Sequence, residues 1–200
     1  MRNLVLLLFS LVLFSGCKKD ESNPVENSNS TLSQEIMPLK VGNTWEFQVT
    51  RYDSNNVVIS TRNYTRTVSV EKVIETEKWY LIGNDYYTNR ADGLWIKESS
   101  ESAQAVIVTK YPVSLGEVFW RGSTYWQKKC LSLNEEIIVN NNKYNCIHYE
   151  SYDNTSYHND EYWSKGIGPV KFIHRSMFAY YANYKGPYYE IEELKSYTIK

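Results

Sequence analysis

Hydrophobic and polar residues alternate with a period close to two along most of the chain beyond Ser33. Between Asn63 and Val73, for example, Tyr64, Arg66 and Val68 occupy every second position. This period is typical of a β-strand, whose successive side chains point to opposite faces. No comparable helical stripe is present, so the pattern predicts an all-β body.

Thirteen segments carry strand signals, and turn residues such as Asp53–Asn56 and Asn140–Asn142 separate them. The predicted strands are Thr44–Tyr52, Val57–Val73, Lys78–Ile82, Tyr86–Arg90, Gly93–Glu98, Ala105–Tyr111, Val118–Arg121, Thr124–Leu133, Glu136–Asn140, Lys143–Tyr152, Ser156–Lys165, Pro169–Arg175 and Tyr188–Lys200. Connections this short favour hairpins, so we expect a mostly antiparallel meander.

The N-terminal residues, which precede the predicted strands, have the features of a targeting signal. A run of eleven residues, Leu4–Phe14, which is apolar except for Ser10, follows Arg2. It is too short for a membrane-spanning helix, which needs about 20 residues, and it has the layout of a secretory signal peptide. The chain is therefore expected to leave the cytoplasm, as a lipoprotein, an ordinary secreted protein or a protein with an uncleaved anchor.

Phe14-Ser15-Gly16-Cys17 resembles the bacterial lipobox, although Phe14 stands where Leu is usual. The resemblance implies that residues 1–16 are removed and that Cys17 becomes the lipidated first residue, carrying diacylglyceryl and palmitate groups. Each buried methylene contributes about 0.8 kcal/mol, so two or three acyl chains anchor a domain stably to a membrane.

Residues 17–33 are expected to form the lipidated cysteine and a flexible tether. Ser22–Ser33 consists of Ser, Asn, Glu, Pro and Thr apart from Val25 and Leu32, and it has too few apolar residues to fold. Lys18–Glu21 resembles a sorting signal that sends lipoproteins to the outer face of the outer membrane. The alternative is that these charges simply solvate the tether.

Residues 34–200 are long enough for one domain with a substantial core. The chain has 22 basic and 23 acidic residues, interleaved without a basic face, so no nucleic-acid partner is expected. The unusual feature of the composition is its 18 Tyr and 6 Trp residues, which favour strands.

Two motifs suggest a family. Pro38–Trp45 (PLKVGNTW) and Trp163–Lys171 (WSKGIGPVK) resemble a pattern in Bacteroidota-type outer-membrane lipoproteins of uncharacterised function, and Asp92–Trp95 falls between them in the expected order. The resemblance covers Met37 to about Ile173. It implies a curved, incompletely closed antiparallel barrel similar to periplasmic lipoprotein carriers, and hence an apolar ligand.

The residues of these motifs also have a scaffold interpretation. Trp45 alternates with Phe47 and Val49 on one strand face and is expected in the core. Gly166-Ile167-Gly168 lacks the third glycine and the following helix of a dinucleotide-binding loop, so a bulge or tight turn is predicted. No cofactor is expected.

Cys130 and Cys146 remain as a pair in an oxidising compartment, which permits a disulfide. Both lie in predicted strands around one connection, so the geometry is plausible. The alternative is two buried free thiols.

No catalytic or metal-binding motif is present, and no catalytic or metal-binding residue is assigned. Acid–base or metal chemistry would require the fold to align scattered residues. The three histidines, His148, His158 and His174, are scattered, and the candidates are Glu150, Asp160 and Glu161 near His148 and His158. The alternative is that these carboxylates only solubilise exposed strand faces.

Clustered aromatic residues are the remaining candidates for binding, either as an exposed platform for sugars or apolar chains or as core residues. The candidate ligand-binding rings are Trp120, Trp126, Tyr180, Tyr181, Tyr184 and Tyr188, with Tyr125 and Tyr189 close by in the sequence.

Two functions compete. The first is a non-catalytic lipoprotein of the bacterial outer membrane that binds an apolar ligand or a partner protein at the envelope, and a continuous apolar concave face would favour it. The second is a glycan-binding accessory lipoprotein of a nutrient-uptake system, which aromatic rings lying in solvent beside carboxylates or amides would favour.

Overall fold

The computed structural model describes residues 35–122, 126–153, 158–176 and 188–200. Every described residue lies in one compact unit, Thr31–Lys200. This unit, called the body below, contains the whole described core and can therefore be produced and tested alone. The predicted signal peptide, Cys17 and the tether lie outside the described residues.

The described part of the body consists of strands joined by turns and loops. The strands are β1 (Thr44–Asp53), β2 (Val58–Ile74), β3 (Glu77–Ile82), β4 (Asp85–Arg90), β5 (Gly93–Lys97), β6 (Val106–Lys110), β7 (Val118–Trp120), β8 (Trp126–Val139), β9 (Asn142–Asp153), β10 (His158–Ser164), β11 (Gly168–Ser176) and β12 (Tyr188–Thr198). They form one 12-stranded sheet in the order β6-β5-β4-β3-β2-β1-β12-β11-β10-β9-β8-β7, which confirms the antiparallel all-β prediction.

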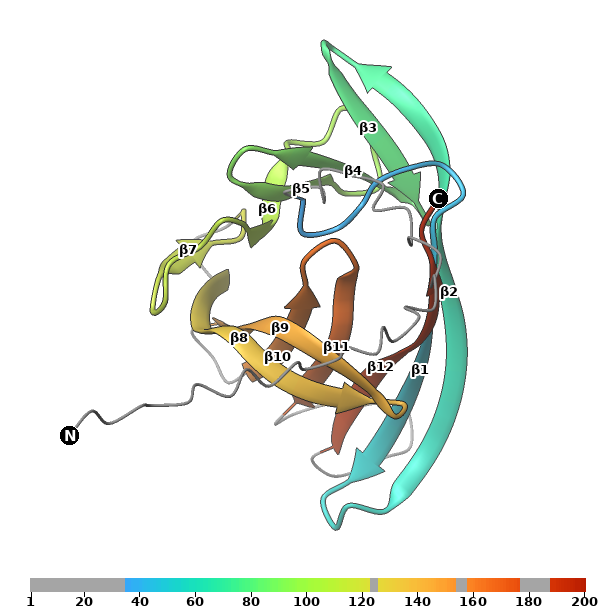
Figure 1. Cartoon of the computed structure of the whole chain (residues 1–200), viewed down its shortest axis with the longest axis vertical. Helices are drawn as coiled ribbons and strands as arrows, with labels where there is room; N and C mark the ends of the chain where they lie inside the picture. The colour runs from blue at the N-terminus through green and yellow to red at the C-terminus, as the bar shows by residue number, and fades with distance from the viewer. Residues whose placement is uncertain (1–34, 123–125, 154–157, 177–187) are drawn as a thin grey trace, which may run out of the picture. The chain divides into compact units, whose positions relative to one another are not determined.

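The sheet curls into a nearly closed barrel with one unsealed seam (Figure 1). The first and last strands, β1 and β12, pair in the middle of the sheet, and among the described strands β6 and β7 form its two ends. Side chains cross between the two ends of the sheet: Tyr149 Oη donates to the Lys110 carbonyl at 2.6 Å, and Lys128 Nζ lies 3.4 Å from Thr109 Oγ1. The predicted incompletely closed barrel is therefore confirmed.

One boundary in the predicted strands is wrong. The segments expected at Thr124–Leu133 and Glu136–Asn140 are one continuous strand, β8. The polar residues between them do not break the strand, because two register shifts against β9, between Cys130 and Glu135, absorb the irregularity. Bulges of this kind let a strand bend without ending.

The turn between β8 and β9 shows why these residues form a hairpin. Asn140 and Asn141 both have positive φ angles, 49° and 64°, between Val139 and Asn142 of the flanking strands. A two-residue hairpin whose residues both have positive φ matches the right-handed twist of its strands, and Asn tolerates this conformation well.

The two sequence motifs, Pro38–Trp45 and Trp163–Lys171, contact each other in the core. Trp45 is fully buried, and its Nε1 donates to the Ile167 carbonyl at 2.6 Å. A Cβ atom at Gly168 would lie 3.1 Å from Met37, so this glycine permits close packing. Trp45 is thus a core residue, as predicted, and the opening and closing motifs contact each other there.

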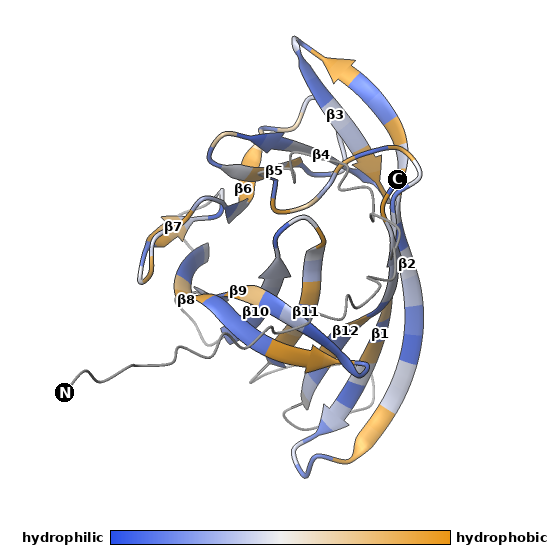
Figure 2. Cartoon of the chain, viewed as in Figure 1, coloured by the Kyte–Doolittle hydropathy of each residue, from blue (hydrophilic) through white to orange (hydrophobic). Residues whose placement is uncertain are grey.

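Figure 2 shows strongly hydrophilic and near-neutral residues along the middle of β2, with apolar residues near both of its ends. Val58 at one end and Val73 at the other are more than half exposed. In the part of the chain that the structure describes, no helix is long and apolar enough to cross a membrane.

Candidate functional site

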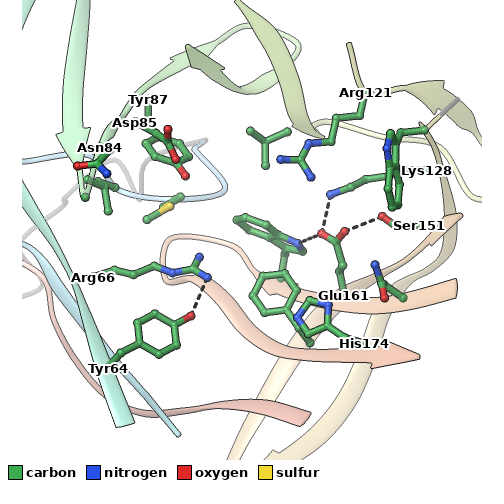
Figure 3. Close-up of a pocket in the computed structure, with 18 of the residues that line it drawn as sticks. Tyr64, Arg66, Asn84, Asp85, Tyr87, Arg121, Lys128, Ser151, Glu161 and His174 are labelled. Atoms are coloured by element: carbon green, nitrogen blue, oxygen red, sulfur yellow. Dashed lines mark hydrogen bonds and ion pairs between the residues drawn. The ribbon is translucent and has the colours of Figure 1, made fainter. Parts of the chain in front are cut away.

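The curved sheet encloses a cavity of about 590 Å³. One wall is formed by β2, the turn after β3 and the first residues of β4, and the opposite wall by β8, β9, β10 and β11. Figure 3 shows the charged and aromatic side chains that point into this space. This cavity is the candidate functional site.

Arg66 and Tyr64 of β2 form the polar part of the first wall, because alternation along the strand turns both toward the interior. Arg66 Nη2 donates to Tyr64 Oη at 2.8 Å and pairs with Glu192 of β12 at 2.9 Å, and Tyr64 also donates to Glu192. The guanidinium lies 5.0 Å above the centre of the Phe47 ring. Burial alone would lower the pKa of Arg66, but Glu192 and Tyr64 outweigh it and raise the pKa, so Arg66 stays charged.

Lys128 and Glu161 form a buried ion pair on the opposite wall. Lys128 Nζ lies 2.5 Å from Glu161 Oε2, and the two side chains are only 1% and 8% exposed. Glu161 also accepts hydrogen bonds from Ser151 Oγ at 2.7 Å and from Trp163 Nε1 at 3.1 Å. Three protein donors therefore surround this carboxylate.

The protonation of the pair follows from burial and these contacts. Burial would raise the pKa of Glu161, but Lys128 and the hydrogen bonds from Ser151 and Trp163 outweigh it and lower the pKa. The pKa of Lys128 is lowered, chiefly by burial, with a further contribution from the nearby charge of Arg121. Glu161 is thus held as a carboxylate.

Arg121 directly follows β7 and points into the cavity (Figure 3). Its backbone NH donates to the Trp126 carbonyl at 2.9 Å, which fixes the residue beside the start of β8. Its guanidinium lies 3.6 Å from Glu98, whose side chain is 61% exposed. This ion pair is long and solvated, so it holds the guanidinium weakly.

Aromatic rings complete the lining. Trp126, Trp163 and Phe172 line the wall of β8, β10 and β11, and Tyr87 lines the opposite side. The ring of His174, which also lines the cavity, stacks on Phe172 with centroids 5.8 Å apart. The concave face is therefore a mixture of aromatic and charged groups, and the continuous apolar face that would favour a purely apolar ligand is not what the structure shows.

The predicted ligand-binding aromatics separate into three groups. Trp126 lines the cavity. Trp120 lies on edge strand β7, is 49% exposed, and lines a different depression together with Trp95 and Val106. The others fall outside the described residues or, for Tyr188, lie at the start of β12 where the side chain is not described; they are Tyr180, Tyr181, Tyr184 and Tyr188.

Of the two alternatives for Cys130 and Cys146, the structure shows two buried free thiols. Cys130 lies opposite Tyr149 and Cys146 opposite Glu135, so the two are not cross-strand partners. The two-residue turn at Asn140–Asn141 sets the register that pairs Cys146 with Glu135, and Cys130 lies farther along β8. Burial raises the pKa of Cys130 and raises that of Cys146 to about 12, which disfavours the reactive thiolate.

The histidine and carboxylate candidates are only partly brought together. His148 lies between two carboxylates, with Nδ1 2.8 Å from Glu135 and Nε2 3.1 Å from Asp160. Its ring stacks on Tyr162, with centroids 4.3 Å apart. Asp160 and Tyr162 alternate with cavity-lining residues along β10, so this network faces away from the cavity.

The remaining candidates lie elsewhere. His158 pairs with Glu150 at 3.3 Å on the surface, and Glu161 belongs to the cavity with His174. Within the described residues, no group of three His, Cys, Asp or Glu side chains is placed to hold a metal ion. The fold therefore defines an all-β protein whose single curved sheet surrounds a cavity with an amphipathic lining.

Comparisons with known proteins do not identify a family or a ligand for this chain. No protein-family model matches the chain, and no curated protein matches its sequence. A candidate lipoprotein from Parabacteroides distasonis is similar over 80% of this chain and 98% of its own, with 13% identity and a TM-score of 0.36. A LolA superfamily protein from Nitrosomonas europaea is similar over 85% of this chain and 91% of its own, with 9% identity and a TM-score of 0.24. Both scores are low, so neither likeness establishes a family or a ligand.

Proposed function

We propose that this chain is a non-catalytic bacterial lipoprotein, acylated at Cys17 and anchored in the outer membrane, whose body binds a small amphipathic molecule in the cavity. The N-terminal signal pattern and the lipobox resemblance support the anchor. The size and lining of the cavity support the binding function.

The observation that carries the binding proposal is the presence of charged groups in the interior of the sheet. A buried pair such as Lys128–Glu161 contributes little net stability compared with well-packed apolar residues of similar size, because removing both charges from water is costly. Charges kept in a cavity at this cost are typical of sites that recognise a ligand.

The lining also indicates the kind of ligand. Small-molecule sites commonly have volumes of about 300–1,000 Å³ and combine apolar or aromatic walls with a few fixed polar groups. The cavity of about 590 Å³ fits this description. Trp126 and Phe172 offer apolar contact area, while Arg66 and Arg121 offer charge and hydrogen bonds, so an amphipathic molecule satisfies both.

The anchor is tested by replacing Cys17 with Ser in the full chain. We expect the wild-type protein to incorporate labelled palmitate and to fractionate with the outer membrane, and Cys17→Ser to lose both properties. Antibody labelling of intact cells then tells whether the body faces outward, as the resemblance of Lys18–Glu21 to a sorting signal suggests. Equal palmitate labelling of the two proteins would contradict the anchor proposal.

The binding proposal is tested by native mass spectrometry of the body purified from cells that make its natural envelope lipids. We expect an additional small-molecule mass that disappears on denaturation. Asn159→Trp fills the cavity from β10 and should abolish this mass. Asn63→Trp makes the same substitution at an exposed position of β2 outside the cavity lining and should retain it.

A wild-type body that carries no bound mass, or one whose bound mass survives in Asn159→Trp, would contradict the cavity proposal. The first outcome would direct attention to a partner protein at the envelope, and the second would place the ligand at another surface.

A glycan-binding function is favoured by one separate observation. The half-exposed Trp120 lines a surface depression together with Trp95 and the amide-bearing Gln104. An indole beside an amide suits a sugar ring, which stacks on the aromatic face and bonds to the polar group. If this site binds glycans, Trp120→Ala should abolish signals on a glycan array that the wild-type body gives, and unchanged signals would exclude it.

A further inference from the structure

The carboxylates and the arginines that line the cavity differ in how many of their hydrogen-bonding atoms already have a protein partner. Both carboxylates that line it already have protein donors. Glu161 is engaged by Lys128, Ser151 and Trp163. Asp85 accepts a hydrogen bond from the Ser99 backbone NH at 2.9 Å. A cationic ligand would therefore have to compete with existing contacts.

The two guanidinium groups, in contrast, keep donors available. Arg66 uses only Nη2 for its contacts with Tyr64 and Glu192, so Nε and Nη1 have no acceptor among the described residues. Arg121 makes no side-chain hydrogen bond to a described residue, and its ion pair with Glu98 is 3.6 Å long. An arginine carries five N–H donors and satisfies them best with a carboxylate or phosphate.

The two arginines reach the cavity from different parts of the fold. Arg66 comes from β2 in the middle of the sheet, and Arg121 follows edge strand β7. Figure 3 shows them pointing into the cavity from opposite sides. Trp126, Trp163 and Phe172 line the space beside them. An anionic group can thus meet the arginines while the apolar part of the same molecule packs against the rings.

We infer that the cavity selects amphipathic anions, with a carboxylate or phosphate head group held by Arg66 and Arg121 and an apolar part packed against the aromatic wall. This inference rests on the proposed cavity-binding function and adds the charge and the orientation of the ligand. It predicts that the head group, more than the apolar part, decides which molecules bind.

The test is isothermal titration calorimetry of the body with three probes that share one chain: octanoate, octyl phosphate and the neutral octanamide. One charge-assisted hydrogen bond commonly corresponds to about a tenfold to hundredfold change in affinity. We expect at least one of the two anions to bind about tenfold or more tightly than octanamide, and the tighter anion identifies the preferred head group. Higher ionic strength should weaken anion binding and leave octanamide binding unchanged.

Substitutions test the assigned residues. Arg121→Gln should weaken binding of the preferred anion by about tenfold and leave octanamide unaffected. The matched control is Lys129→Gln, which removes the same charge from an exposed position on β8 and should leave all affinities unchanged. Because Arg66 also neutralises Glu192, it is tested in the double variant Arg66→Gln/Glu192→Gln, which removes both charges. Circular dichroism confirms that each variant folds.

The outcomes separate this inference from the function on which it rests. Equal binding of octanoate, octyl phosphate and octanamide would overturn the anion selectivity and leave the cavity function standing. Anion binding that Arg121→Gln and the double variant both retain in full would overturn the assignment of the arginines. Failure of all three probes, together with no co-purified mass in the native spectrum, would overturn the cavity function itself.

Discussion

Replacing Lys128 with Met is expected to lower the free energy of unfolding of the body by about 3–5 kcal/mol. The substitution preserves much of the side-chain volume but leaves the buried Glu161 carboxylate without its cation. Ser151 and Trp163 still donate to it, yet neutral donors do not replace a full positive charge. Urea unfolding of the wild-type and variant bodies, monitored by tryptophan fluorescence, measures the difference.

The matched control is the double variant Lys128→Met/Glu161→Leu, which removes both charges. Since an apolar replacement of a whole buried ion pair is often neutral or stabilising, we expect it to be much more stable than Lys128→Met alone. A double variant at least as unstable as the single one would contradict the account, because it would show that lost packing rather than an uncompensated charge causes the effect.

The same pair predicts how stability depends on pH. The pKa of Glu161 in the folded body lies below its ordinary value. Its contribution is therefore complete above the unfolded pKa of about 4.3 and is lost as the pH falls through the lower folded pKa. On acidification below about pH 4.3, the wild type should lose more stability than the double variant. Parallel losses in the two proteins would contradict an ionised Glu161.

Trp45→Ala is expected to destabilise the body by about 3–5 kcal/mol. Trp45 is fully buried where the two motifs meet, so the substitution leaves a large cavity and also removes the indole donor to the Ile167 carbonyl. Trp45→Phe should cost less, about 1–3 kcal/mol, because the ring is largely retained and the main loss is the hydrogen bond. Urea unfolding again provides the measurement.

Trp120→Ala is the control for this prediction. It removes the same type of side chain from a half-exposed position on an edge strand and should cost about 1 kcal/mol or less. If Trp45→Ala lowered the free energy of unfolding no more than Trp120→Ala does, the contact between the opening and closing motifs would not be a major source of the body's stability.

The strands could be predicted from the sequence because strand periodicity is a local property. The alternation of Trp45, Phe47 and Val49 appears directly in the burial of β1. The break predicted within β8 was wrong, because polar residues there lie in bulges that only the pairing with β9 defines. Register depends on the partner strand, which a local pattern does not contain.

Only some residues of the cavity had a signal in the sequence from which they could be predicted. Arg66 occupies an inward position of an alternating strand between Tyr64 and Val68, and a charge at such a position is the signal that could have identified it. The pairing of Lys128 with Glu161 joins residues 33 positions apart on strands that are not neighbours in the sheet. It depends on how far the sheet curls. Arg121 ends the predicted strand Val118–Arg121, and no feature of the sequence identified it as a residue of the cavity.

The cysteines also show that spacing in the sequence does not determine strand register. Their spacing around one connection permitted a disulfide, but spacing does not determine which residues face each other across the strands. The turn at Asn140–Asn141 places Cys146 opposite Glu135, and beyond the register shifts in β8 Cys130 lies opposite Tyr149. Both thiols are buried without being joined.

Whether the interior of the curved sheet is a ligand site is tested most directly by a crystal structure of the body, purified with its co-purified molecule from cells that make its natural envelope lipids. We expect electron density for one small molecule inside the cavity, with its head group on Arg66 and Arg121 and its apolar part against Trp126. A co-purified molecule bound outside the cavity, with only water between Arg66 and Arg121, would contradict a ligand site in the interior.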